Sequence, residues 1–182
     1  MKSKIVEKFK IRDKQIIFRY PTLKDVDDYL ELINRLVKEK AMINVQEKCT
    51  RKQEINFLKD ILGQIRKGIL VHLVVEVDGK VMGNAGIPKG RFSANSHIGE
   101  FGIILRKEIR DMGIGTKLLN CALKEAKNKL GMKIAELGVF ENNEVAKKLY
   151  RSCGFKKIGT IKDGCNYYGK YVDSIIMVKY LR

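Results

Sequence analysis

The chain has few of the residues that build metal centres, disulfide frameworks or membrane spans. Its 182 residues include two histidines and four cysteines, and the cysteines show no paired spacing. We therefore expect no metal centre and no disulfides. Free thiols are expected at Cys49, Cys121, Cys153 and Cys165. No apolar run approaches the ~20 residues that cross a bilayer. The charged start Met1-Lys-Ser-Lys also lacks an apolar signal core, so the expected location is cytoplasmic.

Proline is nearly absent, and no repeat or linker interrupts the sequence. Only Pro21 and Pro88 occur, and the composition is 45% hydrophobic and 32% charged. These values are typical of a globular protein. A chain of this length buries an adequate core as one unit, so residues 1–182 are expected to form a single domain.

Acidic residues are also few relative to basic residues. The chain has 37 Lys and Arg against 21 Asp and Glu, a formal net charge of +16. Such charge is consistent with attraction to nucleic acid or the ribosome. It is equally consistent with a lysine-rich solvated surface that also attracts a polyanionic cofactor. The lysines are scattered rather than clustered, which favours the second interpretation.

The hydrophobic pattern predicts a strand, two helices and a hairpin in the first half of the chain. A strand is expected at 15–20, paired with 8–12. A helix with Thr22 as its N-cap follows, and Thr50 with Gln53 forms a capping box for a second helix. The Asp78-Gly79 turn then joins strands at 71–77 and 81–87. The expected apolar positions of the two helices are Val26, Tyr29, Leu30, Ile33, Leu36 and Val37, then Leu58, Ile61, Leu62 and Ile65.

The segment 110–116 reads Arg-Asp-Met-Gly-Ile-Gly-Thr and joins an apolar strand at 100–105 to an amphipathic helix. Two glycines let the backbone approach a ligand, and the N–H groups of the first helical turn have no partner within the helix. Such a helix start binds anions, most often a phosphate or pyrophosphate. The expected apolar face of the helix consists of Ile114, Leu118, Leu119, Ala122, Leu123, Ala126 and Leu130.

Spacing excludes two common phosphate-binding motifs. A dinucleotide fingerprint needs a third glycine where Leu118 stands, and no stretch matches the nucleotide-triphosphate loop. The remaining pattern, Arg-x-x-Gly-x-Gly after a strand, resembles the pyrophosphate loop of the GNAT superfamily of N-acetyltransferases. A second block supports the resemblance, because residues 143–155 contain Asn-x-x-Ala-x-x-Leu-Tyr followed by Gly-Phe.

This resemblance implies a GNAT-type α/β (α+β) fold, with a mixed, mostly antiparallel sheet and helices on both faces. Later strands are expected at 156–161 and 174–180. It also implies acetyl-CoA as co-substrate, without a metal. The residues expected to contact acetyl-CoA are Ile103, Ile104, Leu105, Arg110, Asp111, Met112, Gly113, Ile114, Gly115, Thr116, Asn143 and Tyr150. Arg106, Lys107 and Lys117 are expected to add positive charge near the loop.

Two residues are predicted to be catalytic. An amine with a pKa of ~10.4 is almost entirely protonated at pH 7, so attack requires a general base. Glu100 lies on the strand that leads into the loop and is the best candidate; a solvated strand-edge glutamate is its alternative role. Glu76 and His97 are weaker rivals. By resemblance, Tyr150 protonates the departing thiolate, and a backbone N–H within 102–104 meets the carbonyl oxygen.

The acceptor is not defined by a specific motif. The connection at 39–49 and the cluster Tyr167, Tyr168 and Tyr171 are expected near it, and Asp163 and Asp173 are candidates to attract a cation. A peptide or protein amine is slightly preferred over a small-molecule amine or polyamine. A polyamine would require a locally acidic site in so basic a chain. A non-catalytic CoA-binding or nucleic-acid-associated module is the alternative of another class. The oligomeric state, a homodimer included, stays open.

Overall fold

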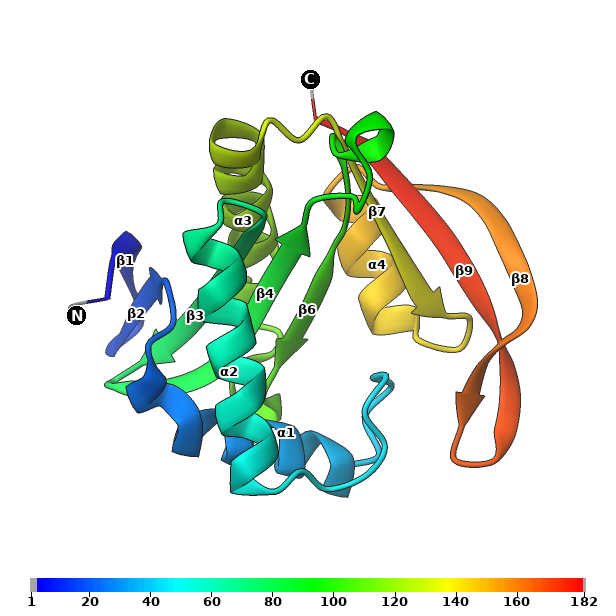
Figure 1. Ribbon diagram of the computed structural model, residues 1–182. Coiled ribbons are helices and arrows are strands. Elements are labelled where there is room, and N and C mark those ends of the chain that lie inside the picture. Colours follow the sequence, from blue (N-terminus) through cyan, green and yellow to red (C-terminus); the bar gives the residue numbers. More distant parts are fainter. Residues whose placement is uncertain (1–2, 182) are drawn as a thin grey trace.

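The computed structural model describes residues 3–181 and contains two β-sheets that lie side by side (Figure 1). The first sheet has the strand order β1-β2-β3-β4-β6, and all its pairs are antiparallel. Its strands are β1 (Ile5–Ile11), β2 (Lys14–Arg19), β3 (Leu70–Val77), β4 (Lys80–Pro88) and β6 (Gly102–Leu105). The second sheet has the order β5-β7-β9-β8, with one parallel pair, β5 and β7. Its strands are β5 (Ile98–Glu100), β7 (Ile134–Phe140), β8 (Lys156–Tyr167) and β9 (Lys170–Tyr180).

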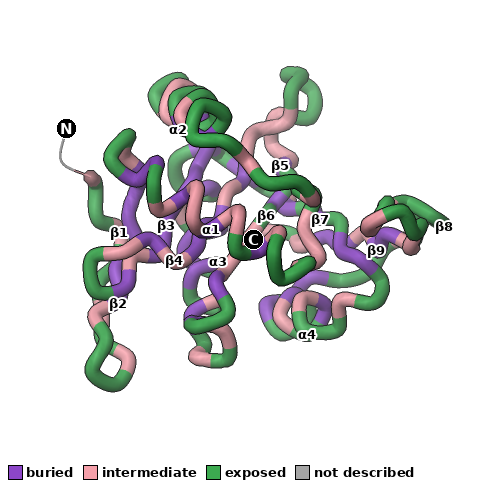
Figure 2. The backbone as a smooth tube through the Cα atoms, turned by 90° about the horizontal axis from the view of Figure 1, so that it is seen from below, coloured by how far each residue is buried: buried purple, intermediate pink, exposed green. Residues whose placement is uncertain are grey.

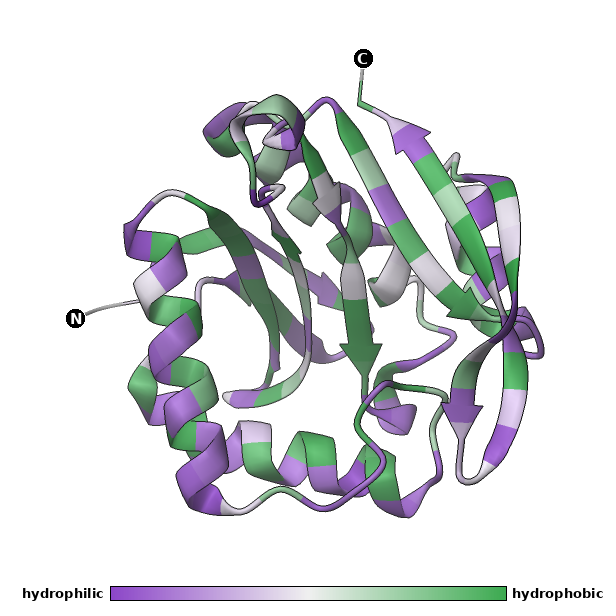
Figure 3. Cartoon of the chain, turned by 45° about the vertical axis from the view of Figure 1, so that its right-hand side comes forward, coloured by the Kyte–Doolittle hydropathy of each residue, from purple (hydrophilic) through white to green (hydrophobic). Residues whose placement is uncertain are grey.

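Helices cover both faces of the first sheet, which confirms the predicted fold class. On one face, α1 (Val26–Lys38) and α2 (Arg51–Arg66) pack through a small apolar cluster of Val26, Tyr29, Leu58, Val74 and Val81. On the other face, α3 (Ile114–Leu130) packs on the main core, and α4 (Glu144–Ser152) packs beside α3. Every position predicted for the apolar face of α3 is buried. The amphipathic pattern of the helices is visible in Figure 3.

Local sequence signals place the turns and caps. Asp78 and Gly79 both adopt positive φ, 48° and 86°, as a two-residue hairpin turn requires. Thr50 accepts a hydrogen bond from the Gln53 N–H, which confirms the predicted capping box. Thr22 caps a short 3-10 turn (Leu23–Asp25) that precedes α1, rather than α1 itself.

Three features differ from the predicted elements. The fully buried Leu32 of α1 was missed, whereas Leu30, Ile33 and Val37 are only half-buried. Strands β8 and β9 are longer than expected, and β8 is mostly exposed (Figure 2). Most importantly, the apolar run at 100–105 is not one strand, because β5 and β6 belong to different sheets. Within residues 3–181, no helix is long and apolar enough to cross a membrane.

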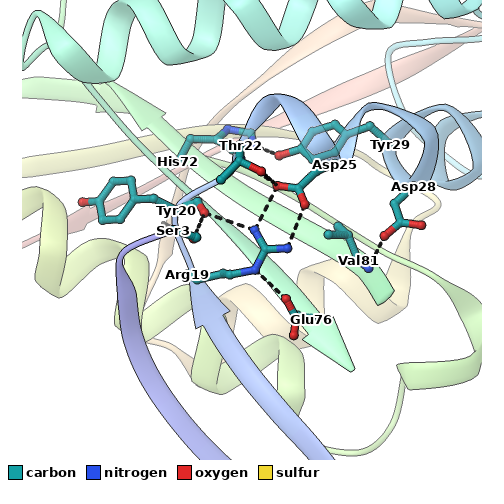
Figure 4. Close-up of polar contacts among 10 residues, drawn as sticks. All are labelled: Ser3, Arg19, Tyr20, Thr22, Asp25, Asp28, Tyr29, His72, Glu76 and Val81. Carbon is teal, nitrogen blue, oxygen red and sulfur yellow. Dashed lines mark hydrogen bonds and ion pairs between the residues drawn. The ribbon is translucent and has the colours of Figure 1, made fainter. Parts of the chain in front are cut away.

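A buried ion-pair network joins the second strand to the segment that enters α1 (Figure 4). The Arg19 guanidinium donates to both carboxylate oxygens of Asp25, at 2.9 and 2.8 Å, and its Nε lies 2.6 Å from Glu76 Oε2. Breaking one partner would leave a buried charge uncompensated. Glu76, a weaker candidate for the general base, is therefore engaged in structural pairing.

Next to this network, His72 lies beneath α1 on β3. Its Nε2 is 2.9 Å from the Tyr29 hydroxyl, and the side chain is buried (Figure 4). Burial lowers the pKa of His72 to about 4. The folded protein therefore holds the neutral imidazole at pH values where the unfolded chain, with a pKa near ~6.5, already binds a proton.

This difference predicts a stability change at acidic pH. The His72 contribution is complete above pH ~6.5 and is lost as the pH falls towards 4, by up to about 3 kcal/mol of unfolding free energy. Urea unfolding at pH 7 and pH 4.5 measures it. His72→Gln, which cannot titrate, should lose less stability than the parent chain over this interval. Parallel losses in the two chains would contradict the assignment.

Candidate active site

The two sheets separate at Phe101, and the predicted functional residues lie around this point. Strands β5 and β7 pair in register up to Glu100 and Glu136, and the Phe101 N–H donates to the Glu136 carbonyl at 2.7 Å. Beyond this bond, β6 continues beside β4 and β7 continues beside β9. No backbone hydrogen bond joins β6 to β7 in the described part of the chain. The facing edges of β6 and β7 therefore stay unpaired (Figure 1).

The alternating direction of the backbone groups along β6 determines which of them face this split. The Phe101 N–H points to β7, whereas the Arg106 N–H donates to Met82 on β4 at 2.8 Å. Backbone groups of successive residues in a strand point to opposite edges. Ile103 and Leu105 therefore direct their N–H and carbonyl groups into the split. Ile104 directs its groups towards Asn84 on β4, so its backbone is not on the predicted ligand side.

The loop after β6 exposes a row of unpaired N–H groups at the start of α3. Asp111 and Gly113 both have positive φ, 59° and 73°, which turns the chain sharply before Ile114. Within residues 3–181, no backbone acceptor pairs with the N–H groups of 111–116. A Cβ added to Gly113 would meet no atom within 4 Å, so the space above it is open. This is the geometry of an anion site at a helix N-terminus, strengthened by the dipole of a 17-residue helix.

Arg110 supports this loop from within. Its Nε and Nη2 donate to the Leu105 carbonyl at 3.0 and 2.9 Å, and Nη2 also lies 3.3 Å from Glu39. The side chain thus folds back on the end of β6 instead of extending towards the open side of the loop. The contact of Arg110 with acetyl-CoA, expected from the sequence, stays a prediction. The Leu105 carbonyl is occupied as well, while the Leu105 N–H stays available.

The two sequence blocks meet at Gly115. A methyl group there would lie 3.3 Å from Leu105 Cδ1 and 3.5 Å from Leu149 Cδ2. The loop, β6 and α4 are therefore in contact at one glycine, and a larger residue would separate them. This contact brings the Asn143–Tyr150 segment to the split, although about thirty residues separate it from the loop.

Asn143 and Tyr150 lie at the two ends of α4. The Asn143 Oδ1 caps the helix by accepting from the Ala146 N–H at 3.1 Å, a structural role that its Nδ2 does not share. Tyr150 is 7% exposed, and burial raises its pKa to about 12. Its hydroxyl has no partner among the described residues and is not among the fully enclosed polar atoms. The small exposed part of Tyr150 therefore includes its hydroxyl.

Rings connect Tyr150 to the point of separation. Its ring centroid is 5.8 Å from that of Phe155, which in turn is 6.3 Å from Phe101. Glu100, the residue before Phe101, is exposed and points to the opposite face of the sheet, the one that carries α1 and α2 in the first sheet. It forms no ion pair with any residue that the structure describes. The predicted acid and base thus approach the split from its two faces.

Other predicted contributors lie elsewhere. Arg106 is buried beneath α1, with Nη2 2.8 Å from Glu31 Oε1, and Lys117 lies over the Phe9 ring. Neither adds charge at the open side of the loop. The His97 carbonyl accepts from the N–H groups of Lys133 and Ile134, which joins His97 to the start of β7.

Residues expected near the acceptor form a bridge between distant segments. Gln46, in the α1–α2 connection, donates to the Asn166 carbonyl and accepts from the Tyr168 N–H at 2.7 Å. The Tyr167 hydroxyl donates to the Lys40 carbonyl. The connection and the β8–β9 turn, separate in sequence, therefore touch below the split (Figure 1). Tyr171 is 68% exposed and takes no part.

Of the two aspartates predicted to attract a cation, one binds the backbone of the other. Asp173 Oδ1 accepts from the Asp163 N–H at 2.9 Å, across the β8–β9 hairpin. Asp173 lies within β9 rather than before it, so this bond is a side-chain-to-backbone contact between neighbouring strands.

Sequence reasoning missed two polar residues on the face that carries α1 and α2. Asn84 is 8% exposed, and its side-chain amide has no hydrogen-bond partner within residues 3–181. Glu136 lies directly beside Glu100 in the β5–β7 pair. The signal for Glu136 was a lone charge between buried Ala135 and Leu137.

A cavity of about 630 Å³ lies away from these residues, at the far end of α3. Its lining is mainly apolar and includes Tyr20, Leu62, Ile65, Leu70 and Leu130. None of the predicted site residues lines it. We place the site at the sheet split because unpaired backbone donors and the helix start converge there.

Comparison with known proteins agrees with this geometry. Residues 34–155 match the model of the acetyltransferase (GNAT) family. The chain therefore belongs to this family of N-acetyltransferases. It is 32% identical over 107 residues to the L-amino acid N-acetyltransferase AaaT of Escherichia coli. That match covers 59% of this chain and 66% of the relative, just under two thirds of its length.

Solved structures share the whole architecture. The ribosomal-protein-alanine N-acetyltransferase of Brucella melitensis superposes with a TM-score of 0.79 at 26% identity, covering 90% of this chain and 99% of that one. A phosphinothricin acetyltransferase of Sinorhizobium meliloti, solved in complex with acetyl-CoA, gives a TM-score of 0.80 at 21% identity. It covers 91% of this chain and 88% of its own. At this level of identity, the second likeness concerns the fold.

The loop geometry predicts the effect of a charge at Gly113. A carboxylate in Gly113→Asp would occupy the open space above the free N–H groups and repel a diphosphate, so CoA affinity should fall at least tenfold by calorimetry. Gly131→Asp is a matched control, because Gly131 has a similar φ of 67° and open surroundings at the other end of α3. Equal affinities for CoA in the two variants would contradict the assignment.

Proposed function

We propose that the chain transfers an acetyl group from acetyl-CoA to a primary amine, with residues 1–182 as one catalytic domain. The observation that carries this proposal is the convergence of the unpaired 111–116 amides, the free edge of β6 and the Tyr150 hydroxyl. A diphosphate suits the helix start, and an amide-bearing arm suits a free strand edge. Bound there, acetyl-CoA would supply a thioester that is reactive towards amines.

Individual residues of the chain are suited to the binding and proton-transfer steps of this reaction. The Leu105 N–H would donate a hydrogen bond to the pantetheine arm, the amide-bearing part of acetyl-CoA. Asn143 Nδ2 would donate a further hydrogen bond to the cofactor. The Ile103 N–H, the one of the 102–104 stretch that faces the split, is suited to the carbonyl oxygen. Glu100 would take the proton that the acceptor ammonium loses, directly or through water. As the N–C bond forms and the C–S bond breaks, the Tyr150 hydroxyl would give its proton to the sulfur. The second proton that the nitrogen loses would return, directly or through water, to the Tyr150 oxygen, and Glu100 would release the first to solvent.

The relatives support an amine acceptor without defining it. One is named for L-amino acids and another for an alanine of a ribosomal protein. Both names refer to an amino group. A small-molecule amine and a peptide amine are therefore both compatible with this proposal.

Free thiol released from acetyl-CoA in the presence of an amine panel tests the proposed reaction. Tyr150→Phe should lower kcat at least tenfold with little change in the Kd for CoA, because the ring stays and only the acid is lost. Tyr180→Phe, which removes an exposed hydroxyl from the end of β9, is the control. Tight CoA binding without thiol release from any amine would contradict the catalytic proposal and favour a binding module.

The base is tested by pH. Glu100→Gln should lower kcat most strongly at low pH, where the acceptor is most fully protonated. Raising the pH should partly restore the rate, because the free amine then forms without a base. The pKa of Tyr150, about 12, keeps that acid protonated across pH 6–9. A uniform loss at every pH would assign Glu100 a positioning role instead.

A further inference from the structure

Two carboxylates lie side by side where the sheets separate. Glu100 and Glu136 are directly paired in register on the parallel strands β5 and β7. Adjacent strands lie ~4.8 Å apart, and paired residues point to the same face. The neighbours Phe101 and Leu137 face the main core, so both glutamates point to the opposite face. Both side chains are exposed there.

Nothing within the described residues neutralises this pair. Neither glutamate forms an ion pair, although the chain carries a net charge of +16. Other carboxylates on the helices do find cations: Glu31, for example, contacts Arg35, Lys80 and Arg106. Like charges on adjacent strands repel, and a bound cation would relieve that repulsion.

The same face carries a second group without a partner. Asn84 is paired with Ile104 in the β4–β6 ladder and with Val74 of the α1–α2 cluster, so its amide points to this face. It is more than nine-tenths buried, and its side chain has no hydrogen-bond partner among residues 3–181. Its amide is not among the fully enclosed polar atoms, so the small exposed part of Asn84 includes polar atoms that a ligand can reach.

Glycines separate the carboxylates from Asn84. Gly86 and Gly102 are paired in register between them, and a Cβ on Gly102 would meet no atom within 4 Å. His72 Nδ1 lies over the Gly86 position. The face therefore has two negative charges at one end, open space above Gly102, and neutral polar groups at the other end.

We propose that this face selects an acceptor with two positive charges, such as a diamine or a peptide with a basic residue beside its amino group. This inference rests on the proposed acetyl transfer. When Glu100 accepts the proton of the reacting amine, Glu136 keeps its charge and holds the second cation. A free amino acid is disfavoured, because its carboxylate would meet the same two carboxylates.

Binding measurements test this selection without requiring turnover. The CoA-saturated protein is titrated with 1,4-diaminobutane, butylamine and free alanine. The diamine should bind at least tenfold more tightly than butylamine, and the preference should shrink at high salt, because salt screens exposed charges. Equal affinities for diamine and butylamine, or tighter binding of alanine, would overturn the inference.

Substitutions locate the effect. Glu136→Gln should weaken diamine binding about tenfold while leaving butylamine and CoA binding within twofold. Glu7→Gln removes the same charge from exposed β1 and should change neither. If Glu136→Gln leaves diamine binding unchanged, as expected for Glu7→Gln, then Glu136 does not bind the second positive charge of the acceptor. If the parent chain does not bind CoA, that result would instead contradict the proposed function. Failure of this inference and failure of the proposed function are therefore distinguishable.

Discussion

The constraint on which this site depends is the loss of pairing between two strands. One hydrogen bond, from the Phe101 N–H to the Glu136 carbonyl, ends the contact between the sheets. Beyond it, the N–H groups of Ile103 and Leu105 have no strand beside them. Exposed backbone donors at a strand edge attract an extended, amide-bearing partner. The unpaired backbone groups at the split thus form the binding surface that the proposed reaction needs.

The helix start and the split reinforce each other. Gly115 allows Leu105 of β6, the N-terminus of α3 and Leu149 of α4 to meet within van der Waals distance. Arg110 then ties the loop to the end of β6 through the Leu105 carbonyl. The anion site, the free edge and the Tyr150 hydroxyl are thereby fixed relative to one another by packing. Such preorganisation is what group transfer requires of a protein scaffold.

The sequence predicted the parts of the fold that depend on local chemistry. The apolar stripe of α3, the Thr50 cap and the Asp78-Gly79 turn arise from spacing and backbone preference, and all three are found. The division of 100–105 was missed, because the run from Phe101 to Leu105 is apolar throughout. Only the competition between two partner strands decides where it divides. That competition is a property of the assembled sheets.

The functional residues could be predicted where a sequence motif defines them. They could not be predicted where contacts between distant segments define them. Arg110 was predicted from a motif to contact acetyl-CoA, whereas its bond to the Leu105 carbonyl is a tertiary contact that a local pattern does not reveal. Glu136 and Asn84 gain meaning only from their neighbours across the sheet. Amide hydrogen exchange with and without CoA tests the central claim directly. Protection should rise at Leu105 and across 112–116, and unchanged exchange at these amides would contradict the account.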